Sequence, residues 1–266
     1  MLRRRLAMLA SGGLLTLAIG CTVLRQPTAL PTSGNLTRDQ LVIRSDFPLP
    51  RHHRLVDELV AQRGDVVDRL GLPASDEPIY VYLFESSQRF ATFMDKNYPD
   101  FPDRRAFFVE TDTVLSVYAY WGDRVAEDLR HEVAHGYLHT MVPHLSLWMD
   151  EGLAEYFEVP RGRRGLNRPH ITLLLDELRE GRWSPDMATL EHIPSAADMT
   201  QRDYAESWAW MHLLLETSPQ RRDLLRNHLA RIRMAGSAVP LSEVLRTAEP
   251  NAAQNLVSHL KSLQSE

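Results

Sequence analysis

Residues 131–135 have the sequence His131-Glu132-Val133-Ala134-His135, which is the most informative stretch of the chain. On an α-helix, side chains four residues apart lie on the same face, so the two imidazoles can bind one metal ion. Glu132 lies between them, where it can serve as a general base toward a metal-bound water. The stretch therefore predicts a helix that supplies two metal ligands and a base.

The flanking sequence is that of an amphipathic helix. Gly122 and Asp123 precede a start with acidic early turns, and Pro143 ends the helix. Apolar residues recur at helical spacing at Val125, Leu129, Val133, Leu138 and Met141. A His-Glu-x-x-His pattern also arises by chance, so the alternative is an ordinary amphipathic helix whose histidines happen to lie four apart.

A carboxylate-rich segment follows after a short turn, with the sequence Trp148-Met149-Asp150-Glu151-Gly152-Leu153-Ala154-Glu155-Tyr156. Glu151 and Glu155 lie four residues apart, so one can bind the metal while the other accepts a hydrogen bond from a ligand histidine. Three protein ligands with one open position are typical of a catalytic rather than a structural zinc. His139 extends the histidine stripe, but one helix does not easily aim three successive turns at one ion. We therefore place His139 at the surface or behind a ligand.

Together, these two segments resemble the gluzincin metallopeptidases, in which a Glu on the helix after the motif helix is the third ligand. More narrowly, residues 131–158 are similar to the peptidase MA-like lipoproteins and, more distantly, to the aminopeptidase N type. The resemblance implies one zinc ion bound by His131, His135 and Glu151, with Glu132 as catalytic base. It also implies that Glu155 is the acidic residue behind a ligand. The spacing from His135 to Glu151 is shorter than in aminopeptidase N, which separates the chain from that branch.

Tyr204 is a further candidate, in the segment that begins Asp203-Tyr204-Ala205-Glu206-Ser207-Trp208. This segment resembles the Y-x-x-G/S stretch that opens a later helix in these peptidases. The resemblance implies that the Tyr204 hydroxyl stabilises the oxyanion, a role in which a neutral donor favours the transition state. The alternative is an aromatic residue at a helix start that packs on the core.

The pattern of elements predicts an α+β fold. Strands are expected at 41–45, 79–84, 106–110 and 114–120, the last two as a hairpin, and helices at about 51–70 and from 86 or 87 to 95. The later helices are expected at about 170–180, 203–217, 219–233 and 251–263. This order is consistent with a gluzincin-like (thermolysin-like) domain with a small mixed sheet. We expect a sheet-containing half with the zinc-binding helices at 41–160 and a helical subdomain at 161–266, with 114–120 as an edge strand beside the cleft.

The first twenty residues have the features of an export signal, with Arg3, Arg4 and Arg5 before a short apolar run. That run ends in Leu17-Ala18-Ile19-Gly20-Cys21, which resembles a bacterial lipobox, and Cys21 is the only cysteine of the chain. We therefore expect an exported protein of the cell envelope, anchored to a bacterial membrane through lipid on Cys21. The alternative is an uncleaved N-terminal anchor. Residues 21–40 are expected to be a flexible tether.

The predicted function is peptide-bond hydrolysis by a zinc metallopeptidase, acting on peptides or unfolded proteins. Residues 114–122 lack the Gly/Met/Glu-containing stretch with which the aminopeptidase N type anchors a substrate amine, so we expect an endopeptidase. The mildly acidic charge of −5 argues against a nucleic-acid partner. The alternative function is a non-catalytic envelope lipoprotein with a structural zinc, although such a site has no use for Glu132.

A basic loop at 160–169 follows the helix that carries Glu151 and Glu155, with arginines at 161, 163, 164 and 168. Its glycines and prolines predict an irregular segment. We interpret it as a solvated loop, with binding of a substrate carboxylate as the alternative.

Overall fold

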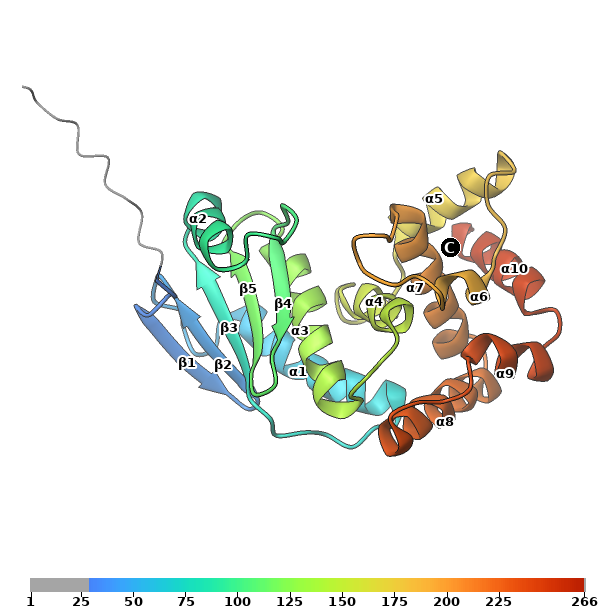
Figure 1. Cartoon of the computed structure of the whole chain (residues 1–266), viewed down its shortest axis with the longest axis horizontal. Helices are drawn as coiled ribbons and strands as arrows, with labels where there is room; N and C mark the ends of the chain where they lie inside the picture. Colours follow the sequence, from blue (N-terminus) through green and yellow to red (C-terminus); the bar gives the residue numbers. More distant parts are fainter. Residues whose placement is uncertain (1–28, 266) are drawn as a thin grey trace, which may run out of the picture.

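The structure, a computed structural model, describes residues 29–265 (Figure 1). This part of the chain has an α+β fold with one mixed sheet and ten helices. The strands are β1 (Gly34–Arg38), β2 (Leu41–Ser45), β3 (Ile79–Phe84), β4 (Ala106–Glu110) and β5 (Leu115–Tyr120). The helices are α1 (Arg54–Leu70), α2 (Ser87–Asn97), α3 (Val125–Met141), α4 (Leu147–Phe157), α5 (Arg168–Arg179), α6 (Met187–Leu190), α7 (Gln201–Glu216), α8 (Pro219–Ala235), α9 (Leu241–Ala248) and α10 (Ala252–Gln264).

The sheet has the strand order β1-β2-β3-β5-β4. Strands β2, β3 and β5 are parallel to one another, and β1 and β4 pair antiparallel at the two edges. The expected hairpin is confirmed, because β4 pairs with β5 from Ala106 opposite Ala119 to Glu110 opposite Leu115. The expected edge position of 114–120 is wrong: β5 lies between β3 and β4, and β4 is the edge strand.

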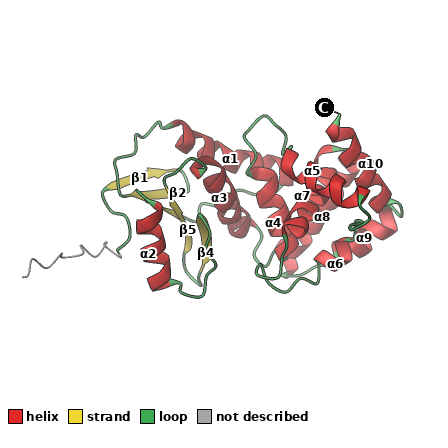
Figure 2. Ribbon diagram, turned by 90° about the horizontal axis from the view of Figure 1, so that it is seen from above, coloured by secondary structure: helices red, strands yellow, loops and turns green. Residues whose placement is uncertain are grey.

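Both faces of the sheet are covered by helices, and the alternation along β3 shows why. Ile79, Val81 and Leu83 belong to the large core that includes α1 and α3, whereas Tyr82 and Phe84 face an aromatic cluster with Phe90 and Phe93 of α2. Successive strand residues point to opposite faces, so an uninterrupted apolar run must be buried on both sides. Figure 2 shows the sheet between α2 and the pair α1 and α3.

The second half of the chain is helical, as expected. It packs around α7, which contacts α4, α5, α8 and α10. Helix α4, placed by the sequence in the sheet-containing half, lies against α7 (Figure 1). A Cβ atom added at Gly152 would lie 2.5 Å from the carbonyl oxygen of Ser207, so only glycine permits this close approach. The contact holds the carboxylates of α4 at a fixed position between α3 and α7.

Three segments differ from their expected structure: residues 34–38, α6 and α9. Residues 34–38, which were assigned to the flexible tether at 21–40, form β1 and pair with β2 from Gly34 opposite Ser45 to Arg38 opposite Leu41. A short polar sequence such as this gains its order from a neighbouring strand, which local sequence does not reveal. The predicted helices also omitted α6 and α9, which are short.

The predictions for the N-terminus fall outside the described residues. These are the export signal at 1–20, lipid attachment at Cys21, and the first part of the tether. Within residues 29–265, none of the helices combines the length and the apolar character needed to span a bilayer. The membrane anchor therefore stays a prediction.

Candidate metal site

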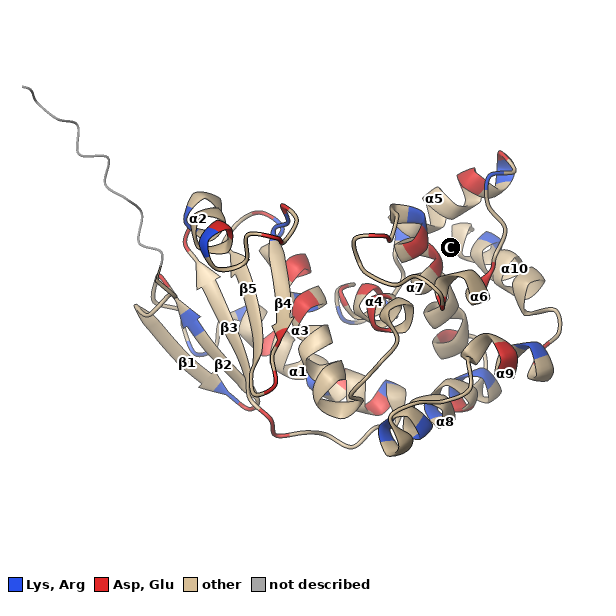
Figure 3. Ribbon diagram, viewed as in Figure 1, with Lys and Arg blue, Asp and Glu red and all other residues tan. Residues whose placement is uncertain are grey.

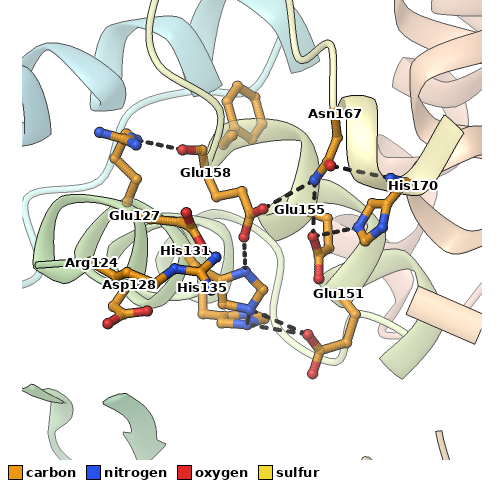
Figure 4. Close-up of polar contacts among 12 residues, drawn as sticks. Arg124, Glu127, Asp128, His131, His135, Glu151, Glu155, Glu158, Asn167 and His170 are labelled. Atoms are coloured by element: carbon orange, nitrogen blue, oxygen red, sulfur yellow. Dashed lines mark hydrogen bonds and ion pairs between the residues drawn. The ribbon is translucent and has the colours of Figure 1, made fainter. Parts of the chain in front are cut away.

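The motif helix is α3, and its two histidines converge with a carboxylate of α4 (Figure 4). The Nε2 atoms of His131 and His135 lie 3.2 Å apart. The Oε2 atom of Glu151 lies 3.5 Å from the first and 3.6 Å from the second. A tetrahedral ion with ligands at about 2.1 Å separates its donor atoms by about 3.4 Å. The three atoms therefore have the spacing of ligands around one ion.

The three donor atoms are largely buried, and one of them makes no hydrogen bond in the described part of the chain. His135 and Glu151 are each only 6 % exposed. The Glu151 Oε2 atom is buried and makes no hydrogen bond with any group of residues 29–265. An ionised carboxylate in such a place is costly unless a cation or a donor meets it. His131, His135 and Glu151 are thus a group that could hold a metal ion.

A carboxylate lies behind each of the two histidines, and one of them orients its ring by a hydrogen bond. The Nδ1 atom of His131 lies 3.1 Å from Oε2 of Glu158, and Nδ1 of His135 lies 3.0 Å from Oδ2 of Asp150. With Nδ1 of His131 directed at an acceptor, its Nε2 is left to face the centre of the triad, whereas the contact of His135 with Asp150 is an ion pair without hydrogen-bond geometry. The same Asp150 oxygen also lies 3.0 Å from Nε2 of His139. His139 is therefore partly buried behind a ligand, one of the two positions expected for it.

The local charges favour a cation at the centre. Burial alone would lower the pKa of His135, but the carboxylates of Asp150 and Glu151 raise it to about 10. Burial would raise the pKa of Glu151, but the neighbouring imidazoles of His131 and His135 lower it to about 2. Negative charge thus surrounds both imidazoles. A metal ion bound by the two Nε2 atoms would replace their protons, and the same carboxylates would attract it.

Glu155 has a different partner from the expected one. Its Oε2 atom lies 2.7 Å from Nε2 of His170 on α5, and Asn167 reaches it at 3.5 Å (Figure 4). The hydrogen bond to a ligand histidine that was expected of Glu155 is made by Glu158, whose other oxygen accepts from Asn167 at 3.1 Å. Glu158 directly follows α4, two turns beyond Glu151 and on the same side. The seven-residue spacing was the available signal for it.

Substitution of Glu158 separates its role from that of Glu155. We expect Glu158→Gln to weaken metal binding about 10- to 100-fold, because the His131 ring loses a charged acceptor. Glu155→Gln, which changes a contact with His170, is expected to have a smaller effect. Titration with a chromophoric chelator as competitor measures both affinities. Equal losses in the two variants would contradict the assignment of Glu158.

Glu132 also lines the cleft beside the triad, together with His131. Burial raises the pKa of Glu132, and the two histidines oppose this rise. A carboxylate whose pKa is shifted toward neutrality is better suited to take up and release a proton near pH 7. The position and the shift both fit the predicted base.

Tyr204, at the start of α7, lines the same cleft as His131 and Glu132. Its hydroxyl accepts a hydrogen bond from Arg104 at 3.1 Å, which leaves the phenolic proton free to be donated elsewhere. Burial and the charge of Glu151 raise the pKa of Tyr204, so this proton is retained at neutral pH. Arg104 lies in the loop between α2 and β4 and was not identified from the sequence. No local pattern marks it, since the contact joins residues a hundred positions apart.

The triad opens into a cleft of about 1520 Å³. One wall is formed by the loop before β4 and by α3, and the other by residues 158–170 and Tyr204. Figure 3 shows acidic residues on α3 and α4, the helices that supply the carboxylates of the site. The cleft is large enough for several residues of an extended peptide.

The structure thus brings all six residues named from the sequence into one region, although Glu155 has a different partner: His131, Glu132, His135, Glu151, Glu155 and Tyr204. It adds Asp150, Glu158 and Arg104. Comparison of the chain with models of protein families and with curated protein sequences finds no match. Function is therefore inferred from the chemistry of these residues.

Proposed function

We propose that the protein is a zinc-dependent peptidase of the gluzincin type that hydrolyses internal peptide bonds. The observation that carries this proposal is the triad of His131, His135 and Glu151, with 3.2–3.6 Å between donor atoms and a buried Glu151 oxygen that makes no hydrogen bond within residues 29–265. Two imidazoles and one carboxylate are a common ligand set of catalytic zinc, and they leave a fourth position open. When bound, zinc polarises a carbonyl and lowers the pKa of water.

The residues of the chain supply the rest of the chemistry. Glu132 takes a proton from the attacking water and passes it to the leaving amine, since its raised pKa suits both transfers. The Tyr204 hydroxyl, oriented by Arg104, donates to the oxygen on which negative charge develops. Glu158 orients the His131 ring by a hydrogen bond, and Asp150 lies in ion-pair contact with His135.

The sheet edge provides a means to hold an extended substrate. Strand β4 is one of the two edge strands, and its first residue, Ala106, lines the cleft together with Arg105. An exposed strand edge binds a peptide through backbone hydrogen bonds, which are independent of side-chain identity. This mode suits an endopeptidase that acts on unfolded segments. The predicted anchor at Cys21 would keep this activity at a membrane surface.

A non-catalytic protein with a structural zinc is the competing function. A structural site closes all four positions with protein ligands. The triad here opens into the cleft at His131 and has a carboxylate, Glu132, in the position of a base. Both features favour the catalytic function.

The decisive experiment compares metal content, activity and folding on the same preparation of the full chain. We expect about one zinc per chain by elemental analysis and cleavage of a quenched fluorogenic peptide mixture. A chelator should abolish cleavage while the circular dichroism spectrum is preserved, and added zinc should restore cleavage. A protein that holds zinc, cleaves none of the peptides and unfolds when the zinc is removed would establish the structural role instead.

A further inference from the structure

Two of the four arginines in the basic loop at 160–169 pair with carboxylates of neighbouring helices. Arg161 donates to Asp65 of α1 at 2.9 Å, and Arg164 donates to Glu216 of α7 at 2.7 Å. These two contacts fix the loop to helices on either side of it. They point away from the cleft, because neither arginine lines it.

The other two arginines of the loop, Arg163 and Arg168, line the cleft and are exposed. Within residues 29–265, neither forms an ion pair or a side-chain hydrogen bond with the protein. Arg104 lines the cleft from the loop before β4, and its partner is the neutral hydroxyl of Tyr204. Three guanidinium groups on two walls thus lack a paired carboxylate.

The carboxylates that line the cleft are mostly engaged elsewhere. Asp128 accepts from Arg105 at 2.6 Å, and Glu127 pairs with Arg124. On the other wall, Glu155 and Glu158 face His170 and His131, as described above. The remaining two are Glu132, beside the triad, and the exposed Asp103.

We propose that Arg104, Arg163 and Arg168 bind carboxylate groups of the substrate, so that the cleft selects peptides with negative charge near the cleaved bond. This inference rests on the proposed peptidase function. A guanidinium group binds a carboxylate through two parallel hydrogen bonds, which adds direction to the charge attraction. The three arginines without a carboxylate partner outnumber the two carboxylates of the lining, Glu132 and Asp103, that are not engaged by a cationic group, so the unpaired charge of the cleft is positive in a protein whose formal charge is −5.

Four versions of one fluorogenic peptide test the proposal and distinguish two sources of the carboxylate. The peptide carries either Glu or Gln on both sides of its centre, and either a free or an amidated C-terminus. An exposed ion pair changes binding by up to about fivefold, so three arginines give an expected preference of about tenfold in kcat/KM for the charged peptides. The preference should shrink when about 0.5 M salt is added, because dissolved ions screen the attraction between exposed charges.

Variants connect this preference to the named residues. The double variant Arg163→Gln/Arg168→Gln should reduce the charged-to-neutral ratio to about twofold, and Arg104→Gln should also lower it. The matched control is Arg161→Gln, in the same loop but outside the cleft, which should keep the wild-type ratio. A preference that follows the free C-terminus assigns the bound group to the terminal carboxylate, and one that follows Glu assigns it to side chains.

Binding of the same peptides to the zinc-loaded Glu132→Gln variant, followed by fluorescence anisotropy, makes the test independent of turnover. Arginine-dependent binding of charged peptides without any cleavage by the wild type would refute the peptidase function and retain the anionic ligand. Cleavage with equal rates for all four peptides would refute the charge selection alone. A ratio unchanged in the double variant would also overturn the proposal.

Discussion

Glu132→Gln is expected to retain one zinc per chain and to lower kcat by about a thousandfold, the range by which a positioned general base accelerates a reaction. The amide has nearly the same shape as the carboxylate but accepts no proton at neutral pH. Because Glu132 is not one of the three convergent donors, the metal should stay bound. The effect should therefore appear in kcat rather than in metal content.

Two measurements on the same sample check this expectation, elemental analysis and hydrolysis of the fluorogenic peptide. The control is Glu243→Gln, which changes an exposed glutamate of α9 far from the cleft. Undiminished turnover in Glu132→Gln would remove Glu132 from the mechanism. Loss of zinc together with activity would instead make Glu132 a ligand.

Substitution of a metal ligand, in contrast, should lower the zinc content of the protein. His131→Ala, His135→Ala and Glu151→Ala are each expected to weaken zinc binding by more than about 100-fold, beyond what loss of a hydrogen-bonding neighbour causes. The physical reason is that two remaining donors cannot complete the coordination that zinc requires. Activity should fall with metal content, and excess zinc should restore part of it.

His139→Ala is the matched control, because His139 continues the same stripe of α3 but contacts Asp150 and Glu110 rather than the centre. We expect it to bind zinc with at most about a tenfold loss. Competition with a chelator gives the affinities, and circular dichroism checks that each variant is folded. Full zinc content in Glu151→Ala would show that the ligand set is wrong.

Local sequence patterns predicted much of the fold. The helical period placed α3 and most of the helices after it, although not the short α6 and α9, and the strands β2, β3, β4 and β5 followed from short apolar runs. These predictions succeeded because side-chain periodicity is a property of neighbouring residues. Strand β1 was missed because its order depends on pairing with β2.

In the site, too, local spacing predicted some residues and the packing of helices decided others. His131, Glu132 and His135 share a helix face, so their spacing alone fixes their proximity. The choice between Glu155 and Glu158 depends on how α4 lies between α3 and α5, and the structure gives Glu158 to His131 and Glu155 to His170. The two glutamates lie three residues apart, about one helical turn, so both project from neighbouring parts of the helix and local spacing does not tell which of them reaches His131.

The sequence by itself determined the chemical identity of this protein's site: two imidazoles and a carboxylate on one helix, with acidic residues on the next. Only the tertiary structure decided which residues face them. It brought Arg104 to Tyr204 across a hundred positions and placed Arg163 and Arg168 along the cleft. It also made β4, rather than β5, the edge of the sheet. The physical reason is that ligand spacing follows helix geometry, whereas the surroundings of a site follow from the packing of distant elements.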